Sequence, residues 1–269
     1  MSGATLTPEQ LYAFDTMGYL HIPLFLSAEQ IEQARSFLTV EAEKVSADTG
    51  IERWSDLHKK FPSIQDLVCS QHVVGPVLHL INQPLRIVEC YGHRSGEGSF
   101  LYMHNGSTQD QVYEGHIRAT RNMAYRCEYH DGRLYTTFVK VLLYLTDIPE
   151  DGGPFCYVEG SHKANFSFPW PDDVRSGRRM LSESGHAAVR KVPVCAGDAI
   201  FLNEALFHGA AMRRRDGVRA LLAVSFCPSF MADWRYLTRD AGDLESVGYP
   251  DLDDEGDFFD RSTHGTSGT

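Results

Sequence analysis

Apolar residues recur at helical spacing in the first third of the chain. Two capping boxes, Thr7-Pro8-Glu9-Gln10 and Ser27-Ala28-Glu29-Gln30, each precede apolar positions three or four residues apart, and this pattern predicts two helices. A short strand is expected between them, over residues 19–23. One or two further helices are expected over residues 63–81, with an interruption at Gly75-Pro76.

After Asn82-Gln83-Pro84 the pattern becomes strand-like, with short apolar runs separated by Gly, Pro and Asp. Strands are expected over residues 85–91, 100–104, 134–147, 154–158, 187–194, 199–202, 208–212 and 218–226. Many short strands after a helical segment predict a mainly β fold, a sandwich or barrel with the N-terminal helices packed outside.

Three polar stretches separate these elements. Residues 47–60 predict a surface connection, and residues 105–132 form an insertion long enough to be functional or mobile. Residues 166–185 are rich in Pro and charge and predict a loop or lid. The 269 residues suit one domain: a mostly helical part over 1–84, a jelly-roll core over 85–230 and an acidic, partly disordered tail over 240–269.

Composition narrows the possible partners. A net charge of −11 argues against nucleic acid or an anionic membrane. No apolar run approaches the roughly 18–20 residues that span a bilayer. The segment Met1-Ser2-Gly3-Ala4-Thr5 lacks the features of a signal peptide, and six cysteines show no CxxC spacing. We therefore expect free thiols in a cytoplasmic protein, and the oligomeric state stays open.

Two histidines stand at the ends of predicted strands, beside small residues. His104 precedes Asn105-Gly106 and His208 precedes Gly209. A jelly roll would bring two such strands together across its mouth. A pair of imidazoles suits iron, copper, zinc or nickel and leaves open positions for substrates.

Two cations accompany the histidines. Arg219 follows His208 by eleven residues, one hairpin later, where it could bind the far carboxylate of a chelated acid. The alternative is a surface ion pair with Asp198 or Asp216. Lys140 interrupts an apolar strand, so it either points into a polar cavity or extends to solvent from an edge strand.

These motifs, in this order, resemble the phytanoyl-CoA dioxygenase family. The resemblance rests on His104, Leu143-Tyr144-Leu145-Thr146-Asp147-Ile148 with Gly152-Gly153-Pro154, Glu159-Gly160-Ser161-His162-Lys163, Ala196-Gly197-Asp198, His208 and Arg219. It implies a double-stranded β-helix and an enzyme that uses Fe(II), 2-oxoglutarate and O2. It also implies His104 and His208 as iron ligands and Arg219 on the distal carboxylate of 2-oxoglutarate. Lys140 and Tyr91 would line the cosubstrate pocket, and His162 would be structural.

One position departs from the family pattern. The family's first motif is His-x-Asp, in which the Asp is the third iron ligand, but Gly106 stands there. A carboxylate from elsewhere could replace it, and the candidates are Asp110, Glu114, Glu128 and Asp131. Water could fill the site, or Gly106 could leave room for chloride on the iron, as in related halogenases. A different alignment would place the motif at His130-Asp131-Gly132.

The resulting hypothesis is an Fe(II)/2-oxoglutarate-dependent oxygenase that hydroxylates an unactivated C–H bond of a small molecule and releases succinate and CO2. The alternatives are a halogenase and a catalytically inactive cupin-like binding protein. A zinc hydrolase is less favoured, because it would not need Arg219 or Lys140. Asn203 and Glu204 could orient His208, contact the substrate or cap a turn. Candidate residues for binding an anionic or aromatic substrate are Arg118, Arg121, Arg126 and Trp234.

Overall fold

The computed structural model describes residues 5–104, 112–113, 117–118, 127–164, 171–175 and 180–231. Its helices and 3-10 turns are α1 (Pro8–Met17), α2 (Ala28–Ala34), η1 (Arg35–Thr39), α3 (Leu57–Lys60), α4 (Pro62–Val68), α5 (Gln71–Ile81), η2 (Ser161–Lys163), α7 (Asp172–Arg175) and η3 (Leu181–Glu183). Its strands are β1 (Tyr19–Ile22), β2 (Lys44–Val45), β3 (Ile51–Trp54), β4 (Leu85–Ser95), β5 (Leu101–His104), β6 (Val112–Tyr113), β7 (Ile117–Arg118), β8 (Cys127–His130), β9 (Arg133–Thr136), β10 (Val139–Tyr144), β11 (Phe155–Val158), β12 (Val189–Val192), β13 (Ala199–Asn203), β14 (His208–Ala210) and β15 (Arg219–Pro228).

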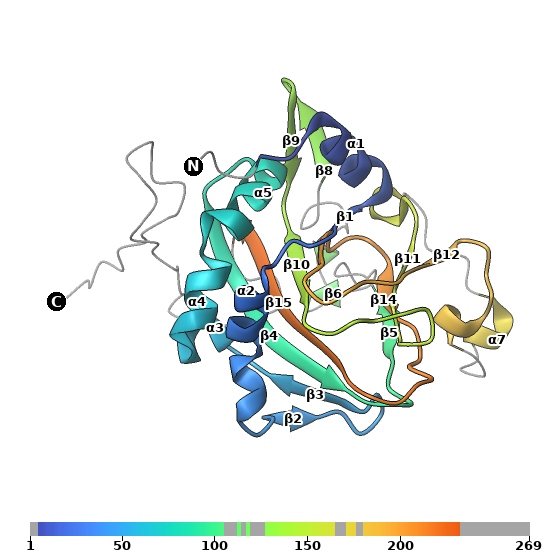
Figure 1. Ribbon diagram of the computed structural model, residues 1–269. Coiled ribbons are helices and arrows are strands. Elements are labelled where there is room, and N and C mark those ends of the chain that lie inside the picture. The colour runs from blue at the N-terminus through green and yellow to red at the C-terminus, as the bar shows by residue number, and fades with distance from the viewer. Residues whose placement is uncertain are drawn as a thin grey trace.

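Two antiparallel sheets make up the body of the protein (Figure 1). The larger has the strand order β1-β13-β10-β15-β4-β3-β2, and the smaller has the order β12-β11-β14-β5. Side chains from both sheets share one apolar cluster, in which Leu142 and Leu221 of the larger sheet pack with Phe155 and Tyr157 of the smaller. The sheets therefore face each other across a common interior, as the mainly β prediction requires.

The helices cover the other face of the larger sheet (Figure 1). Alternate residues of β10 and β15, among them Val141 and Val224, belong to a second cluster that includes Phe14, Phe37 and Val77 of the helical part. Strands that are apolar on both faces are expected when both are covered. Those residues of β10 and β15 that point the other way line the interior between the sheets. No helix in the described ranges is long and apolar enough to span a membrane.

Both predicted capping boxes are present. The side chains of Thr7 and Ser27 accept hydrogen bonds from the backbone of Gln10 and Gln30, whose side chains accept from the backbone N–H of Thr7 and Ser27. α1 ends at Gly18, which has a φ of 82° and donates its N–H to Phe14. Only a residue without Cβ suits that conformation well.

Three predictions about elements were wrong. The break in the helices over 63–81 falls at Cys69-Ser70, where Ser70 caps α5, and Pro76 lies inside α5. The polar connection over 47–60 contains β3 and α3. The single strand expected over 134–147 is two, because β9 pairs with β8 in a hairpin while β10 enters the larger sheet.

Three strands that precede residue 84 (β1, β2 and β3) join the larger sheet. The division of the single domain into a mostly helical part over 1–84 and a jelly-roll core over 85–230 stays a prediction. The expected acidic tail over 240–269 lies outside the described residues.

Candidate metal centre

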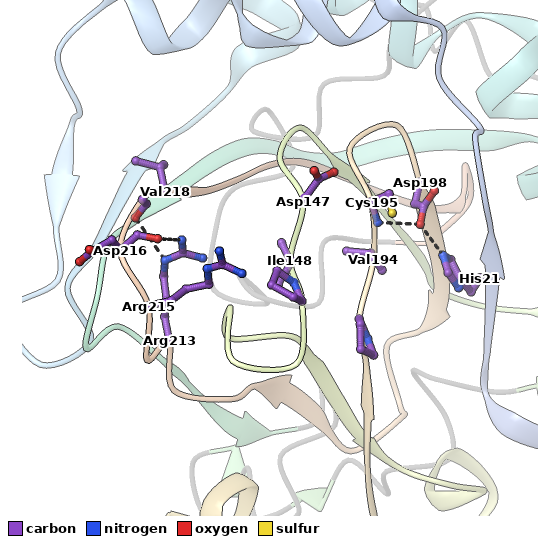
Figure 2. Close-up of a pocket in the computed structure, with 13 residues that line it drawn as sticks. His21, Asp147, Ile148, Val194, Cys195, Asp198, Arg213, Arg215, Asp216 and Val218 are labelled. Atoms are coloured by element: carbon purple, nitrogen blue, oxygen red, sulfur yellow. Dashed lines mark hydrogen bonds and ion pairs between the residues drawn. The ribbon is translucent and has the colours of Figure 1, made fainter.

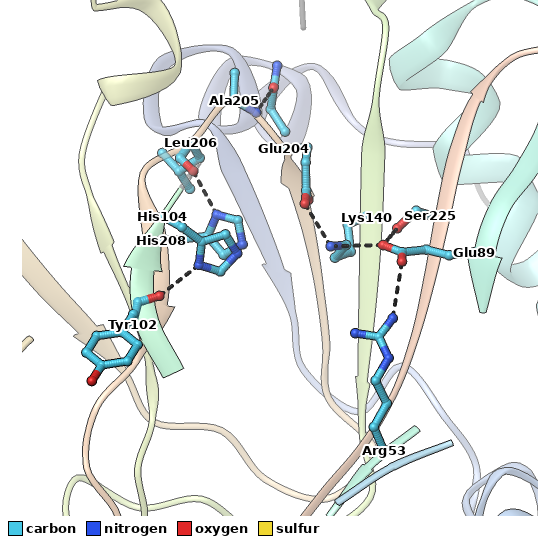
Figure 3. A network of polar contacts seen from close by, with 11 residues as sticks. Arg53, Glu89, Tyr102, His104, Lys140, Glu204, Ala205, Leu206, His208 and Ser225 are labelled. Atoms are coloured by element: carbon cyan, nitrogen blue, oxygen red, sulfur yellow. Dashed lines mark hydrogen bonds and ion pairs between the residues drawn. The ribbon is translucent and has the colours of Figure 1, made fainter. Parts of the chain in front are cut away.

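The structure brings the two predicted histidines together. His104 ends β5, His208 begins β14, and the two are directly opposite each other in the antiparallel pair. Their ring centroids are 4.5 Å apart (Figure 3). The residue His208 is 4% exposed, and Phe155 of the interior cluster lies beside its ring. Both imidazoles therefore belong to the interior between the sheets.

Each imidazole is held by its own strand end. The Nδ1 of His104 lies 2.7 Å from the carbonyl oxygen of Tyr102, and the Nδ1 of His208 lies 2.7 Å from that of Leu206. A carbonyl only accepts, so each Nδ1 carries the proton and each Nε2 carries the lone pair. No partner of either Nε2 is recorded among the described residues. Burial lowers the pKa of His104 and lowers the pKa of His208 further, which keeps both rings neutral.

Arg219 begins β15 and is 4% exposed. Side chains two positions apart in a strand point to the same face, so Arg219 points to the same face as Leu221. Leu221 belongs to the cluster between the sheets, and Arg219 therefore lies on the interior face. Its Nη1 donates to the carbonyl oxygen of Gly153 at 2.8 Å. Within the described part of the chain Arg219 forms no ion pair, so the alternative of a surface pair with Asp198 or Asp216 was wrong. Burial lowers the pKa of Arg219, as expected of an unpaired guanidinium.

Lys140 lies in β10, a central strand, and is 6% exposed, so the alternative of an edge position was wrong. Its ammonium lies 2.8 Å from Oε1 of Glu204 and 3.3 Å from Oε1 of Glu89 (Figure 3). Burial lowers the pKa of Lys140, but the Glu204 carboxylate, with Tyr91 and Glu89, outweighs it and holds the pKa well above its usual value. Lys140 therefore points into the interior as a cation paired with two carboxylates.

Tyr91 lies on the same interior face and is 8% exposed. The Arg53 guanidinium is 4.0 Å from the centroid of its ring, and burial raises the pKa of Tyr91. Arg53 also contacts Glu89, at 3.4 Å. Sequence reasoning missed Arg53 and Glu89. The available signal was a Glu inside the apolar strand over 85–91, the same kind of interruption that singled out Lys140.

Comparison with known proteins identifies the family. The model of the family described as phytanoyl-CoA dioxygenase (PhyH) matches residues 14–220. The chain belongs to the phytanoyl-CoA dioxygenase family. The match confirms the predicted family and the predicted enzyme class, an Fe(II)/2-oxoglutarate-dependent oxygenase.

Solved structures of HygX from Streptomyces hygroscopicus are similar to this member of the phytanoyl-CoA dioxygenase family. The structure with nickel and 2-oxoglutarate is 37% identical, covers 91% of this chain and 96% of its own, and has a TM-score of 0.77. The structure that also contains hygromycin B is 39% identical, with the same coverages and TM-score. EctD from S. alaskensis, 17% identical over 85% of this chain and 78% of its own, has a TM-score of 0.61 and supports the double-stranded β-helix alone. A search of curated proteins gave no match.

The residues on the interior face fit the two cofactors of the phytanoyl-CoA dioxygenase family. Two neutral imidazoles whose Nε2 atoms have no partner among the described residues are suitable iron ligands. Arg219 is buried without an ionic partner in the described ranges, and the second carboxylate of 2-oxoglutarate would provide one. Tyr91 borders the same space.

The candidates for a third ligand divide into two groups. The hairpin of β8 and β9 carries Glu128, whose carboxylate contacts His130, and the exposed Asp131. Within the described ranges no cluster of three metal-ligating side chains exists, so neither carboxylate joins the histidines. The alignment through His130 was also wrong, because that ring is exposed on the hairpin. The remaining positions, which lie outside the residues whose side chains are described, are Gly106, Asp110, Glu114, Arg118, Arg121, Arg126 and Trp234.

His162 is placed as its predicted structural role requires. Its Nε2 lies 3.0 Å from the carbonyl oxygen of Asp15 at the end of α1. A Cβ on Gly18 would come 2.5 Å from its Nδ1. His162 therefore packs the start of β1 against η2.

A separate cavity of about 770 Å³ opens on the protein surface (Figure 2). Asp198 lines it and accepts from His21 and from the backbone N–H of Cys195. Arg213 donates to the carbonyl oxygens of Gly152, Asp216 and Gly217 and thereby holds a turn in place. None of the predicted site residues lines this cavity.

Proposed function

We propose that this protein hydroxylates an unactivated C–H bond of a small molecule, consuming 2-oxoglutarate and O2 and releasing succinate and CO2. One observation supports this most directly. His104 and His208 face each other with both Nε2 atoms available, on an interior that also holds the buried Arg219.

In this proposal His104 and His208 would hold the iron, and Arg219 would bind the distal carboxylate of 2-oxoglutarate. Iron with bound 2-oxoglutarate supplies the activation of oxygen: one oxygen atom enters succinate and the other enters the substrate. Tyr91 and Lys140 line the pocket, and the apolar cluster around Leu142 and Leu221 limits the access of water.

A second function, halogenation, is favoured by one position of the sequence. Gly106 stands where the family's third ligand would be an Asp, and an iron without that carboxylate has room for chloride. The product would then carry chlorine in place of the new hydroxyl group.

Two measurements separate these functions. Succinate should form when the iron-loaded enzyme, 2-oxoglutarate and O2 are incubated with small molecules, hygromycin B among them because HygX binds it. The product should gain one oxygen atom, and the same product should form with and without chloride. Chlorine in the product would instead identify a halogenase. An absence of succinate with every substrate tried, together with an absence of 2-oxoglutarate binding, would contradict the oxygenase proposal.

A further inference from the structure

The side chain of Arg213 joins two turns of the chain. The residue is 3% exposed, and each of its three side-chain nitrogens donates to a backbone carbonyl oxygen. Nε donates to Gly217 at 3.2 Å, Nη1 to Gly152 at 3.0 Å and Nη2 to Asp216 at 2.6 Å (Figure 2). Gly152 belongs to the turn between β10 and β11, whereas Asp216 and Gly217 belong to the turn between β14 and β15. One guanidinium therefore holds together two turns that are far apart in the sequence.

Both turns also position Arg219. Gly217 lies two residues before Arg219, so the turn that contains it sets where β15 begins. Gly153, the residue after Gly152, accepts a hydrogen bond from Nη1 of Arg219 at 2.8 Å. The backbone of Arg219 and the carbonyl oxygen that orients its guanidinium are thus both fixed by the side chain of Arg213.

The Gly152-Gly153 segment lies directly against the segment that carries Arg213. Gly152 and Arg213 form an antiparallel bridge. A Cβ on Gly153 would come 3.0 Å from the carbonyl oxygen of Ala211 and 3.2 Å from the Cβ of Arg213. Because the two segments are in such close contact, a shift of the Arg213 side chain would move the carbonyl oxygen that Arg219 contacts.

An arginine suits this role better than a lysine does. A guanidinium is planar and donates in fixed directions, and Arg213 uses each of its three nitrogens toward a different carbonyl oxygen. An ammonium on a flexible stem could not bind both turns in this geometry. The three carbonyl oxygens also explain why a charged residue is buried here, since a buried charge is costly unless its hydrogen bonds are made.

We propose that Arg213 is a positioning residue for the cosubstrate: it fixes the two turns that orient Arg219 and thereby sets the affinity for the distal carboxylate of 2-oxoglutarate. Hydrogen bonds weaken steeply when the donor points in the wrong direction, so a small rotation of Arg219 would lower that affinity. This inference rests on the proposed function, since it requires that Arg219 binds the carboxylate. Arg213 itself does not touch the cosubstrate.

The test measures the binding of 2-oxoglutarate to the nickel-loaded protein by calorimetry. Arg213→Met, which removes all three donors, should weaken binding about tenfold. The Kd for 2-oxopentanoate, which has a methyl group in place of the distal carboxylate, should stay within about threefold of the wild-type value. In the Arg219→Ala background Arg213→Met should cause no further loss, because the two residues act as a unit.

Arg214→Met is the matched control. Arg214 is the next residue along the chain, but its side chain is exposed and contacts Glu183 at 2.6 Å. The variant should bind 2-oxoglutarate as the wild type does. If Arg213→Met does not fold, Arg213→Lys, whose ammonium can reach one turn but not both, should weaken the binding of 2-oxoglutarate by about threefold or more and that of 2-oxopentanoate by less.

Two results would overturn the inference while the proposed function stands. In the first, Arg219→Ala weakens the binding of 2-oxoglutarate but Arg213→Met leaves it unchanged. In the second, Arg213→Met causes an equally large loss for 2-oxopentanoate or in the Arg219→Ala background, which would mean that Arg213 does not act through Arg219. A wild type that fails to bind 2-oxoglutarate would instead contradict the proposed function, and this inference with it.

Discussion

His104 and His208 are opposite each other in neighbouring antiparallel strands, although they are 104 positions apart in the sequence. Each ring is fixed by a hydrogen bond to the carbonyl oxygen two residues before it, at Tyr102 and Leu206. The pairing of β5 with β14 thus sets the distance between the rings, and the two local hydrogen bonds set the nitrogen that each ring presents.

Removal of either imidazole should weaken metal binding. We expect His104→Ala and His208→Ala each to raise the Kd for Ni(II) by about a hundredfold or more, since loss of even an indirect contact to a metal often costs 10–100-fold. Calorimetry with Ni(II) measures this. His130→Ala is the control, because that ring is exposed on the β8–β9 hairpin and contacts Glu128. If His130→Ala lost as much Ni(II) affinity as His104→Ala and His208→Ala, the assignment of His104 and His208 as the metal ligands would be contradicted.

Arg219 should determine the affinity for 2-oxoglutarate. A hydrogen bond between charged groups contributes about 1.5–3 kcal/mol, so Arg219→Ala should weaken binding of 2-oxoglutarate to the nickel-loaded protein by about 10–100-fold. Arg219→Lys keeps the charge but lacks the planar fork, and should recover only part of the affinity. Arg215→Ala, on the exposed turn before β15, should bind 2-oxoglutarate normally. Equal affinities in all three variants would exclude Arg219 as the anchor.

Features that depend on neighbouring residues could be predicted from the sequence. The capping boxes at Thr7 and Ser27 act within four residues, and each begins a helix as expected. The sequence analysis missed β3 because two charged residues stand at the centre of Ile51-Glu52-Arg53-Trp54 and hide the apolar pattern of a strand. One of them, Arg53, lies over the ring of Tyr91.

The polar network of the interior was beyond sequence reasoning. Glu89, Lys140 and Glu204 come from three separate parts of the chain and meet only because β10 pairs with both β13 and β15, and β15 pairs with β4. Lys140 on its own predicts a buried partner but not which one. The histidines were easier to find, because each combines a metal-binding side chain with a strand end and a neighbouring glycine.

Gly209 should be required for the close approach of β14 to β5. A Cβ at this position would lie 2.7 Å from the carbonyl oxygen of Leu101 and 3.0 Å from the backbone of Met103. Gly209→Ala should force the strands apart, lower the free energy of unfolding by about 1–3 kcal/mol and weaken Ni(II) binding by separating the two imidazoles. Gly96→Ala is the control, because a Cβ there meets nothing within 4 Å. Unchanged Ni(II) affinity in Gly209→Ala would show that the strand spacing does not control the metal centre.

Asp198 should make stability depend on pH. Its carboxylate accepts from His21 and from the backbone N–H groups of Leu24 and Cys195. Burial raises the pKa of Asp198, but these hydrogen bonds outweigh it, and the pKa lies below its usual value. The stabilisation is therefore complete above the unfolded pKa, about 3.9, and is lost as pH falls through the lower folded value.

The variant Asp198→Ala tests this pH dependence. It should lower the free energy of unfolding by about 2–3 kcal/mol at pH 7, since it removes three hydrogen bonds to a charged group. Denaturant unfolding of wild type and variant should show a smaller difference at acid pH than at pH 7. A difference that stays constant across the acid range would contradict the role of the ionised carboxylate.

Gly106→Asp restores the His-x-Asp pattern of the family and should distinguish hydroxylation from halogenation. If the wild type is a hydroxylase, the new carboxylate adds a ligand, so the variant should bind Ni(II) more tightly, by about tenfold, and should yield the same product with and without chloride. If the wild type is a halogenase, the carboxylate occupies the place of chloride, and the variant should lose chlorination. Product mass with and without chloride measures the outcome.

Gly96→Asp, at an open turn position, is the control for Gly106→Asp and should change neither the Ni(II) affinity nor the product. If Gly106→Asp and the wild type bind Ni(II) with the same affinity, a side chain at position 106 does not reach the metal. The argument for halogenation from Gly106 would then fail.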